Sequence, residues 1–234
     1  MITLHAMPPS HPCMTAEAAL KLKGLEYERV DFAVSGEHVE KMGAIYGEGR
    51  TTVPGALIED EPVHGSRAIL ARLEELAPDP PLYPSDAVRE AERWGDEELQ
   101  DLGRLFPWGA LYFRPEAMGT MTPGGTPLDP AGTDFAIGFL RPAWKYHRIS
   151  CKRLAAELAA FPAKVEHVQA LLADGVIGGE QPNAADLQIA ATLRVLLVVG
   201  DVRPLLEPVA DYARGLFPEF PGDIPAGAYP AGWV

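Results

Sequence analysis

The stretch PPSHPC, residues 8–13, places a serine, a histidine and a cysteine at the start of a helical pattern. A thiol near a helix amino terminus can have a lowered pKa and act as a nucleophile, which makes Cys13 a candidate for thiol chemistry. The Ser10 hydroxyl can donate to an anion at the helix start, and the His11 imidazole can donate as well. The alternative is structural, because a serine before a helix is commonly its cap and a cysteine beside it can simply be packed.

The composition narrows the classes of protein and partner. The chain has 20 Lys and Arg against 33 Asp and Glu, and its net charge of -13 disfavours nucleic acid and anionic membranes as partners. Cys13 and Cys151 are far apart in sequence and form no disulfide or metal-ligand pattern. The first ten residues do not resemble a signal peptide, and no apolar run is long enough to cross a bilayer. We therefore expect a cytoplasmic protein that binds no metal, no nucleic acid and no membrane.

Alternating strand and helix patterns fill the first third of the chain. Residues 2–6 and 27–32 are typical of strands, and helical spacing over residues 15–23 stops at a glycine, Gly24. The predicted order is strand 2–6, helix 15–23, strand 27–32, helix 35–46, strand 53–60 with a turn, a short strand at 62–65 and helix 66–76. This order predicts an α/β unit with a small mixed sheet.

A proline-rich linker, residues 78–86, separates this unit from a region with only helical patterns. Apolar residues recur every three or four positions from Val88 to Phe106, which is typical of one long amphipathic helix. Further helices are predicted over 134–147 with a bend at Pro142, and over 151–161, 164–173, 184–199 and 205–217, with a long loop at 115–132. We expect domains at residues 1–77 and 87–217, and then a Pro- and Gly-rich arm at 218–234 that either packs through its aromatic residues or frays.

Four local motifs follow one another along the chain. They are Ser10 through Cys13 with LKLKG at 20–24, TVP at 52–54, GSRAILARLEEL at 65–76 and GGEQPNAADLQIAAT at 178–192. Together they resemble the glutathione transferase superfamily, and most closely its serine-type and zeta-like classes. The resemblance implies a thioredoxin-like domain with a mixed four-stranded sheet, an all-α helical-bundle domain after it, and a homodimer. The first motif also resembles the glutaredoxin cysteine pair, with Ser10 in place of the leading cysteine.

The resemblance places Ser10 at the catalytic serine, which keeps the thiol of glutathione ionised, and Cys13 at a more buried position. A thiol pKa near ~8.5 must fall by about two units, which needs roughly 2.7 kcal/mol. One hydrogen bond to a charged acceptor supplies about 1.5–3 kcal/mol, and a helix amino terminus adds roughly 0.3–1 kcal/mol. Ser10 at a helix start can therefore stabilise the thiolate, with His11 as a further donor.

The other motifs are expected to bind the rest of glutathione. The resemblance implies that Val53 and a cis Pro54 pair with the cysteinyl backbone, and that Ser66 at a helix start binds the γ-glutamyl carboxylate. Gly65 departs from the family, because most members carry an acidic residue there. His64 and Arg67 are the neighbours that can compensate for it.

Candidates elsewhere are a helix cap at Asn183 and Asp186, a cleft for the electrophile lined by Trp108, Tyr112, Phe113 and Met118, and an anionic co-substrate site at Arg114, Arg141 or Arg148.

Three functions compete. The first is a glutathione-dependent transferase in which Ser10 activates the thiolate, with glutathione as the co-substrate and a small-molecule electrophile as the partner. The second is a glutaredoxin-like thiol oxidoreductase in which Cys13 forms a mixed disulfide. The third is a binding protein without activity that keeps the fold, and Gly65 is the residue that favours it.

Overall fold

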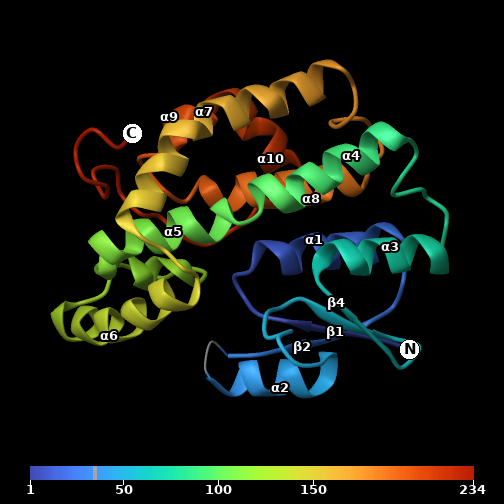
Figure 1. Ribbon diagram of the computed structural model, residues 1–234, viewed down its shortest axis with the longest axis horizontal. Helices are drawn as coiled ribbons and strands as arrows, with labels where there is room; N and C mark the ends of the chain where they lie inside the picture. Colours follow the sequence, from blue (N-terminus) through green and yellow to red (C-terminus); the bar gives the residue numbers. More distant parts are fainter. Residues whose placement is uncertain (34–35) are drawn as a thin grey trace. The chain divides into compact units, whose positions relative to one another are not determined.

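The computed structural model describes residues 1–33 and 36–234, and Figure 1 traces them. Packing divides the chain into two compact units, Met1–Asp96 with Val176–Ala191 and Glu97–Gly175 with Thr192–Val234. The domain boundaries expected on either side of the linker stay predictions. Within the described ranges, no helix has both the length and the apolar character needed to cross a membrane.

A four-stranded sheet forms the centre of the first unit, in the order β2-β1-β3-β4. Its strands are β1 (Ile2–Ala6), β2 (Glu28–Asp31), β3 (Gly55–Ile58) and β4 (Glu61–His64). β1 and β2 are parallel, whereas β3 is antiparallel to both β1 and β4. The predicted mixed four-stranded sheet is therefore confirmed.

Helices cover both faces of this sheet, with α1 (His11–Leu22) and α3 (Ser66–Leu76) on one face and α2 (Gly36–Tyr46) on the other (Figure 1). The face under α1 and α3 is the apolar core, where Leu4, Leu20 and Leu70 are fully buried. The apolar pattern predicted that α1 starts at residue 15, but the helix starts at His11. Pro12 fits there because the first helical turn needs no N–H donor. The expected start of α2 at Ser35 lies outside the described residues.

A late segment of the chain completes the first unit. It begins α8 (Ala184–Leu196), and its Ala184 N–H donates to the Leu82 carbonyl at 2.8 Å. The helix starts with the predicted cap: the Asn183 side chain accepts from the N–H groups of residues 185 and 186, and the Asp186 carboxylate accepts from the Asn183 N–H at 3.0 Å. Asn183 and Asp186 therefore satisfy the exposed donors of the helix start, which is a structural role.

The predicted long helix over residues 88–106 is interrupted, so that prediction was wrong in part. The chain forms α4 (Asp86–Trp94), a π-helical segment η1 (Gly95–Leu99) and then α5 (Leu102–Phe113). At Gly95 a Cβ would lie 2.9 Å from Cγ1 of Ile189, so the close approach of α8 requires glycine there. The spacing of apolar residues does not distinguish these forms, because a single π-helical turn is too short to change the three- or four-residue repeat visibly.

The second unit contains the remaining helices. They are η2 (Pro115–Met121), α6 (Pro130–Tyr146), α7 (Cys151–Ala173), α9 (Arg203–Leu206), η3 (Glu207–Val209) and α10 (Ala210–Leu216). α7 runs through Pro162, so the predicted break between residues 161 and 164 was wrong. Leu158, Phe161 and Val165 keep one buried stripe across the proline, and this packing outweighs the lost backbone hydrogen bond. Conversely, the predicted helix 205–217 is divided into three short helices, and a short 3₁₀ helix, η2, occupies part of the predicted loop 115–132.

The arm at residues 218–234 packs on the second unit. The Ile224 N–H donates to the Val198 carbonyl at 2.8 Å, and the hydroxyl of the buried Tyr229 donates to the Phe106 carbonyl at 2.8 Å. The ring of Trp233 lies edge-on to Phe113, with centroids 6.1 Å apart. Of the two expectations for this arm, packing through its aromatic residues is the one observed.

Candidate active site

Three loops that carry candidate residues meet at one end of the sheet. His5 of β1 pairs with Gly55 of β3, and Gly55 pairs with His64 of β4, so these residues form one row across three strands. The chain leaves β1 toward Ser10, enters β3 from Val53 and Pro54, and leaves β4 into Gly65 and Ser66. The register of the sheet therefore brings together the loops at residues 7–10, 52–54 and 65–66.

Ser10 stands at the amino end of α1 but does not cap it with its side chain. Its backbone is extended, its carbonyl accepts the first helical hydrogen bond from Met14 at 3.0 Å, and its hydroxyl makes no capping bond. The residue is half-buried. The hydroxyl is thus not spent on the helix, which argues against the purely structural interpretation of this serine.

His11 and Cys13 are both enclosed in the first turn of α1. Cys13 is only 1% exposed and His11 is 4% exposed. The Cys13 thiol is not in a disulfide. A nucleophilic cysteine needs access to its partner, and burial of this degree favours a packing role for Cys13.

The loop before β3 has the geometry that the motif TVP predicted. The Val53–Pro54 peptide bond is cis. Among the described residues, no backbone partner is found for the N–H or the C=O of Val53. The Pro54 carbonyl accepts from the Gly65 N–H at 2.9 Å, which links this loop to the start of α3.

Gly65 has a backbone conformation that favours glycine at this position. Its φ of 93° and ψ of 146° are strained for residues with a side chain, whereas a Cβ there would meet nothing within 4 Å. The restriction is therefore conformational rather than steric. Ser66 follows as the first residue of α3 and is 2% exposed, so its side chain is enclosed at the amino end of this helix.

We expect Gly65→Ala to lower the free energy of unfolding by about 1–3 kcal/mol, because alanine would be held in that strained conformation. Chemical denaturation of the purified variant measures the change. Gly43→Ala is the matched control: Gly43 is helical with open space around it, and alanine should raise stability by about 0.5–1 kcal/mol. Equal stabilities of Gly65→Ala and the wild type would contradict the inference that position 65 has a backbone conformation strained for alanine.

The neighbours expected to compensate for Gly65 are engaged elsewhere. The Arg67 Nε donates to the Glu92 carboxylate at 3.1 Å, and the His64 Nε2 lies 2.8 Å from the Thr52 carbonyl. Burial raises the pKa of Glu92 to about 7, against the opposing charge of Arg67. Neither side chain is therefore a simple substitute for an acidic residue at position 65.

Sequence reasoning missed Tyr46 and His5 beside this site. The Tyr46 hydroxyl lies 2.6 Å from Nδ1 of His5, and the Tyr46 ring lies against His64 with centroids 5.7 Å apart. No motif contains these residues: the sheet register aligns His5 with His64 across Gly55, and the packing of α2 adds Tyr46. The only available signal was a polar histidine within each of two predicted strands.

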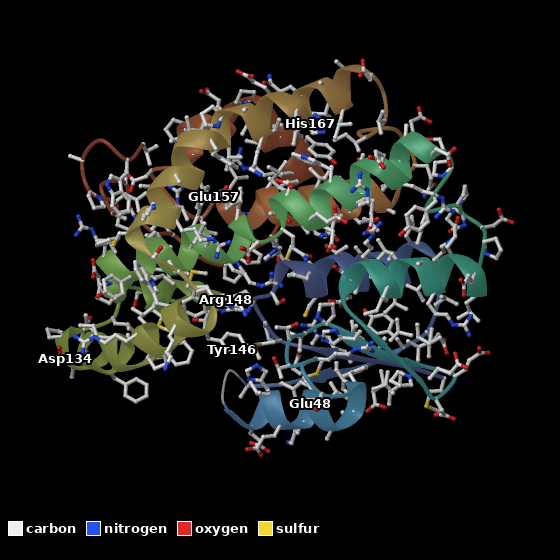
Figure 2. All side chains as sticks on the ribbon, viewed as in Figure 1. Glu48, Asp134, Tyr146, Arg148, Glu157 and His167 are labelled. Carbon is white, nitrogen blue, oxygen red and sulfur yellow. The ribbon has the colours of Figure 1, made fainter. Side chains whose placement is uncertain are left out.

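The candidates for an acceptor site lie in the second unit and are partly structural. The Trp108 carbonyl accepts from the Trp144 indole at 2.8 Å, and the Tyr112 ring packs on Trp144 with centroids 4.1 Å apart. Met118 lies in η2, and Arg114 donates to the Gly227 carbonyl at 2.8 Å. Arg141 and Arg148 are exposed, and Arg148 lies between α6 and α7 (Figure 2).

A thioredoxin-like sheet with a cis-proline loop beside two helix amino termini, followed by a helical region, is the architecture of glutathione S-transferases. Residues 4–81 match the family model described as "Glutathione S-transferase, N-terminal domain". Over these residues the chain is similar to the amino-terminal domain of glutathione S-transferases. The resemblance of the four sequence motifs to the glutathione transferase superfamily is therefore confirmed.

Solved structures share the fold over nearly the whole chain, at low sequence identity. A glutathione S-transferase from Rhodospirillum rubrum F11 is 20% identical with a TM-score of 0.57, covering 93% of this chain and 86% of that one. The beta-etherase LigF from Sphingobium sp. strain SYK-6 is 19% identical with a TM-score of 0.61, covering 93% and 98%. FzlA from C. crescentus is 19% identical with a TM-score of 0.55, covering 99% and 96%. No curated protein matches the sequence.

Proposed function

We propose that this protein is a glutathione-dependent transferase in which Ser10 stabilises the glutathione thiolate. The observation that carries the proposal is the Ser10 hydroxyl, which stands at the start of α1 without a capping bond. A hydroxyl in that place can donate to a sulfur anion, and the positive end of the helix dipole adds to the effect. The fold of the superfamily supports the choice of glutathione as co-substrate.

The remaining parts of glutathione have matching groups in the first unit. The cysteinyl backbone would pair with the N–H and C=O of Val53, for which no backbone partner is found among the described residues. The γ-glutamyl carboxylate would accept from the Ser66 hydroxyl and the first N–H groups of α3. Gly65 provides no carboxylate for the γ-glutamyl amine, so we expect that end to be bound through its carboxylate.

The reaction then needs little from the protein beyond a positioned thiolate. The sulfur attacks an electrophilic carbon of a small molecule and forms an S–C bond, while the leaving group departs with its electron pair. One structural neighbour is called a beta-etherase, and cleavage of an activated ether by a thiolate is a reaction of this type. We propose a cytoplasmic homodimer as the working form, as the family resemblance implies.

The alternatives are weighed by the same residues. A redox cycle at Cys13 needs an accessible thiol, and Cys13 is 1% exposed. Gly65 supports the third alternative, a binding protein without activity, only if glutathione binding requires an acidic residue at position 65. The transferase therefore has the strongest support, and glutathione binding is the property that separates it from a binding protein of other specificity.

Isothermal titration calorimetry with reduced glutathione tests the proposal. We expect saturable binding with a dissociation constant below the millimolar range. Cysteinylglycine, which lacks the γ-glutamyl group, is the matched ligand and should bind more weakly, because it leaves the Ser66 site empty. Absence of heat and of any thermal shift with glutathione would contradict the proposed function.

A further inference from the structure

Two histidines flank a glycine in one row of the sheet. His5, Gly55 and His64 are register partners, so their side-chain positions lie on the same face. Gly55 has no side chain, and the Tyr46 ring takes the space beside it: a Cβ on Gly55 would lie 2.3 Å from Cζ of Tyr46. We call the three side chains of His5, Tyr46 and His64 the brace.

The brace is closely packed and has few conformational choices. The Tyr46 hydroxyl is 2.6 Å from Nδ1 of His5, and both residues are buried. The Phe32 ring stacks on His5 with centroids 5.4 Å apart. Burial lowers the pKa of His5 and of His64, which favours the neutral form of both imidazoles.

His64 connects the brace to the loop of the candidate site. Its Nε2 lies 2.8 Å from the Thr52 carbonyl oxygen, and since a carbonyl only accepts, Nε2 carries the proton and donates. The Thr52 carbonyl and the Val53 N–H belong to one planar peptide group. A donor that holds the carbonyl therefore also fixes the direction of the Val53 N–H.

A second bond holds the other side of the same loop. The Gly65 N–H donates to the Pro54 carbonyl at 2.9 Å. The loop is therefore held at two points: Thr52 is bonded to His64 at the end of β4, and Pro54 is bonded to Gly65, the next residue. Val53 lies between the two tethers, and no backbone partner is found for it among the described residues.

We propose that His64, supported by Tyr46 and His5, is a positioning residue that orients the Thr52–Val53 peptide group for binding of the glutathione backbone. This inference rests on the proposed function, because it assigns a purpose to the Val53 N–H. His64 does not itself touch glutathione. Its contribution is to keep the Val53 donor in place before the ligand arrives, which lowers the ordering cost of binding.

Calorimetry on matched histidine variants tests the inference. His64→Phe keeps a ring but removes the donor, and the dissociation constant for reduced glutathione should rise about three- to tenfold, the effect of one neutral hydrogen bond. His64→Gln restores a side-chain N–H and should recover part of the affinity. His167→Phe on α7, an exposed histidine of the other unit, should bind as the wild type does. In turnover, His64→Phe should raise KM with little change in kcat.

A measurement without ligand separates this inference from the proposed function. The Val53 amide resonance and its hydrogen exchange, followed by NMR, should change in His64→Phe but not in His167→Phe. If the wild type binds no glutathione, the proposed function fails, and the Val53 amide still decides whether His64 orients the loop. Tyr46→Phe, which removes only the hydroxyl, should shift the same amide and is used if His64→Phe does not fold. An unchanged Val53 amide in the folded variants would overturn the inference.

Discussion

Ser10→Ala should lower kcat/KM for glutathione conjugation by at least tenfold. Its hydroxyl is the proposed donor to the thiolate, and one hydrogen bond to a charged acceptor is worth about 1.5–3 kcal/mol, or roughly a ten- to hundredfold change in rate. The same loss should raise the pKa of the bound thiol. The ultraviolet absorbance of the thiolate, titrated with pH in the presence of the enzyme, measures that pKa directly.

Two further variants make this result specific. Cys13→Ala should change the rate little, because Cys13 is buried behind the first turn of α1. Ser10→Thr keeps a hydroxyl and should recover part of the activity. The opposite ranking, in which Cys13→Ala abolishes activity and Ser10→Ala does not, would assign the chemistry to a thiol oxidoreductase.

Glu74→Leu should lower the free energy of unfolding by about 3–5 kcal/mol, because it leaves a buried ammonium without its counter-ion. The Lys23 side chain is 0% exposed, and its Nζ lies 2.6 Å from Oε2 of Glu74 and 2.7 Å from the Pro80 carbonyl. The Glu74 carboxylate also accepts from the Leu82 N–H at 2.8 Å, so it holds the linker to α3. Urea denaturation followed by circular dichroism measures the change.

Glu75→Leu is the control for this prediction. Glu75 is the next residue of α3, but its side chain is 71% exposed and lies 3.4 Å from Arg72, so its loss should cost less than about 1 kcal/mol. The double variant Lys23→Met with Glu74→Leu removes both charges and should recover much of the stability. Equal losses of unfolding free energy in Glu74→Leu and Glu75→Leu would show that the buried Lys23–Glu74 pair stabilises the fold no more than an exposed ion pair does.

The same pair predicts a pH dependence of stability. Burial opposes ionisation of Glu74, but the hydrogen bonds from Lys23 and Leu82 outweigh it and hold the pKa of this carboxyl below its ordinary value. A lowered folded-state pKa gives stability that is present above the ordinary pKa and lost as the pH falls through the folded one. The wild type should therefore lose more stability on acidification than Glu74→Gln does, as measured by unfolding at a series of acidic pH values.

Local sequence was sufficient for features whose determinants are neighbours in the chain. The spacing of its apolar residues predicted the buried stripe of α3, whereas the cap of α8 at Asn183 and Asp186 and the cis bond before Pro54 were predicted from the resemblance of short motifs to a family. Patterns failed where the outcome depended on distant packing. α7 continues through Pro162 because its buried stripe continues, and the helix after the linker contains a π-helical segment where Gly95 meets α8.

The sequence by itself predicted the order of strands and helices in the first third of the chain, the resemblance to glutathione S-transferases and the candidate residues for glutathione. Only the tertiary structure decided which of these residues share one end of the sheet, that the Ser10 hydroxyl is not used as a cap, and that Gly65 has a strained backbone. It also brought His5, Tyr46 and His64 together around Gly55. The reason is physical: strand register and side-chain burial depend on residues far apart in the chain, whereas periodicity and capping are encoded within a few residues.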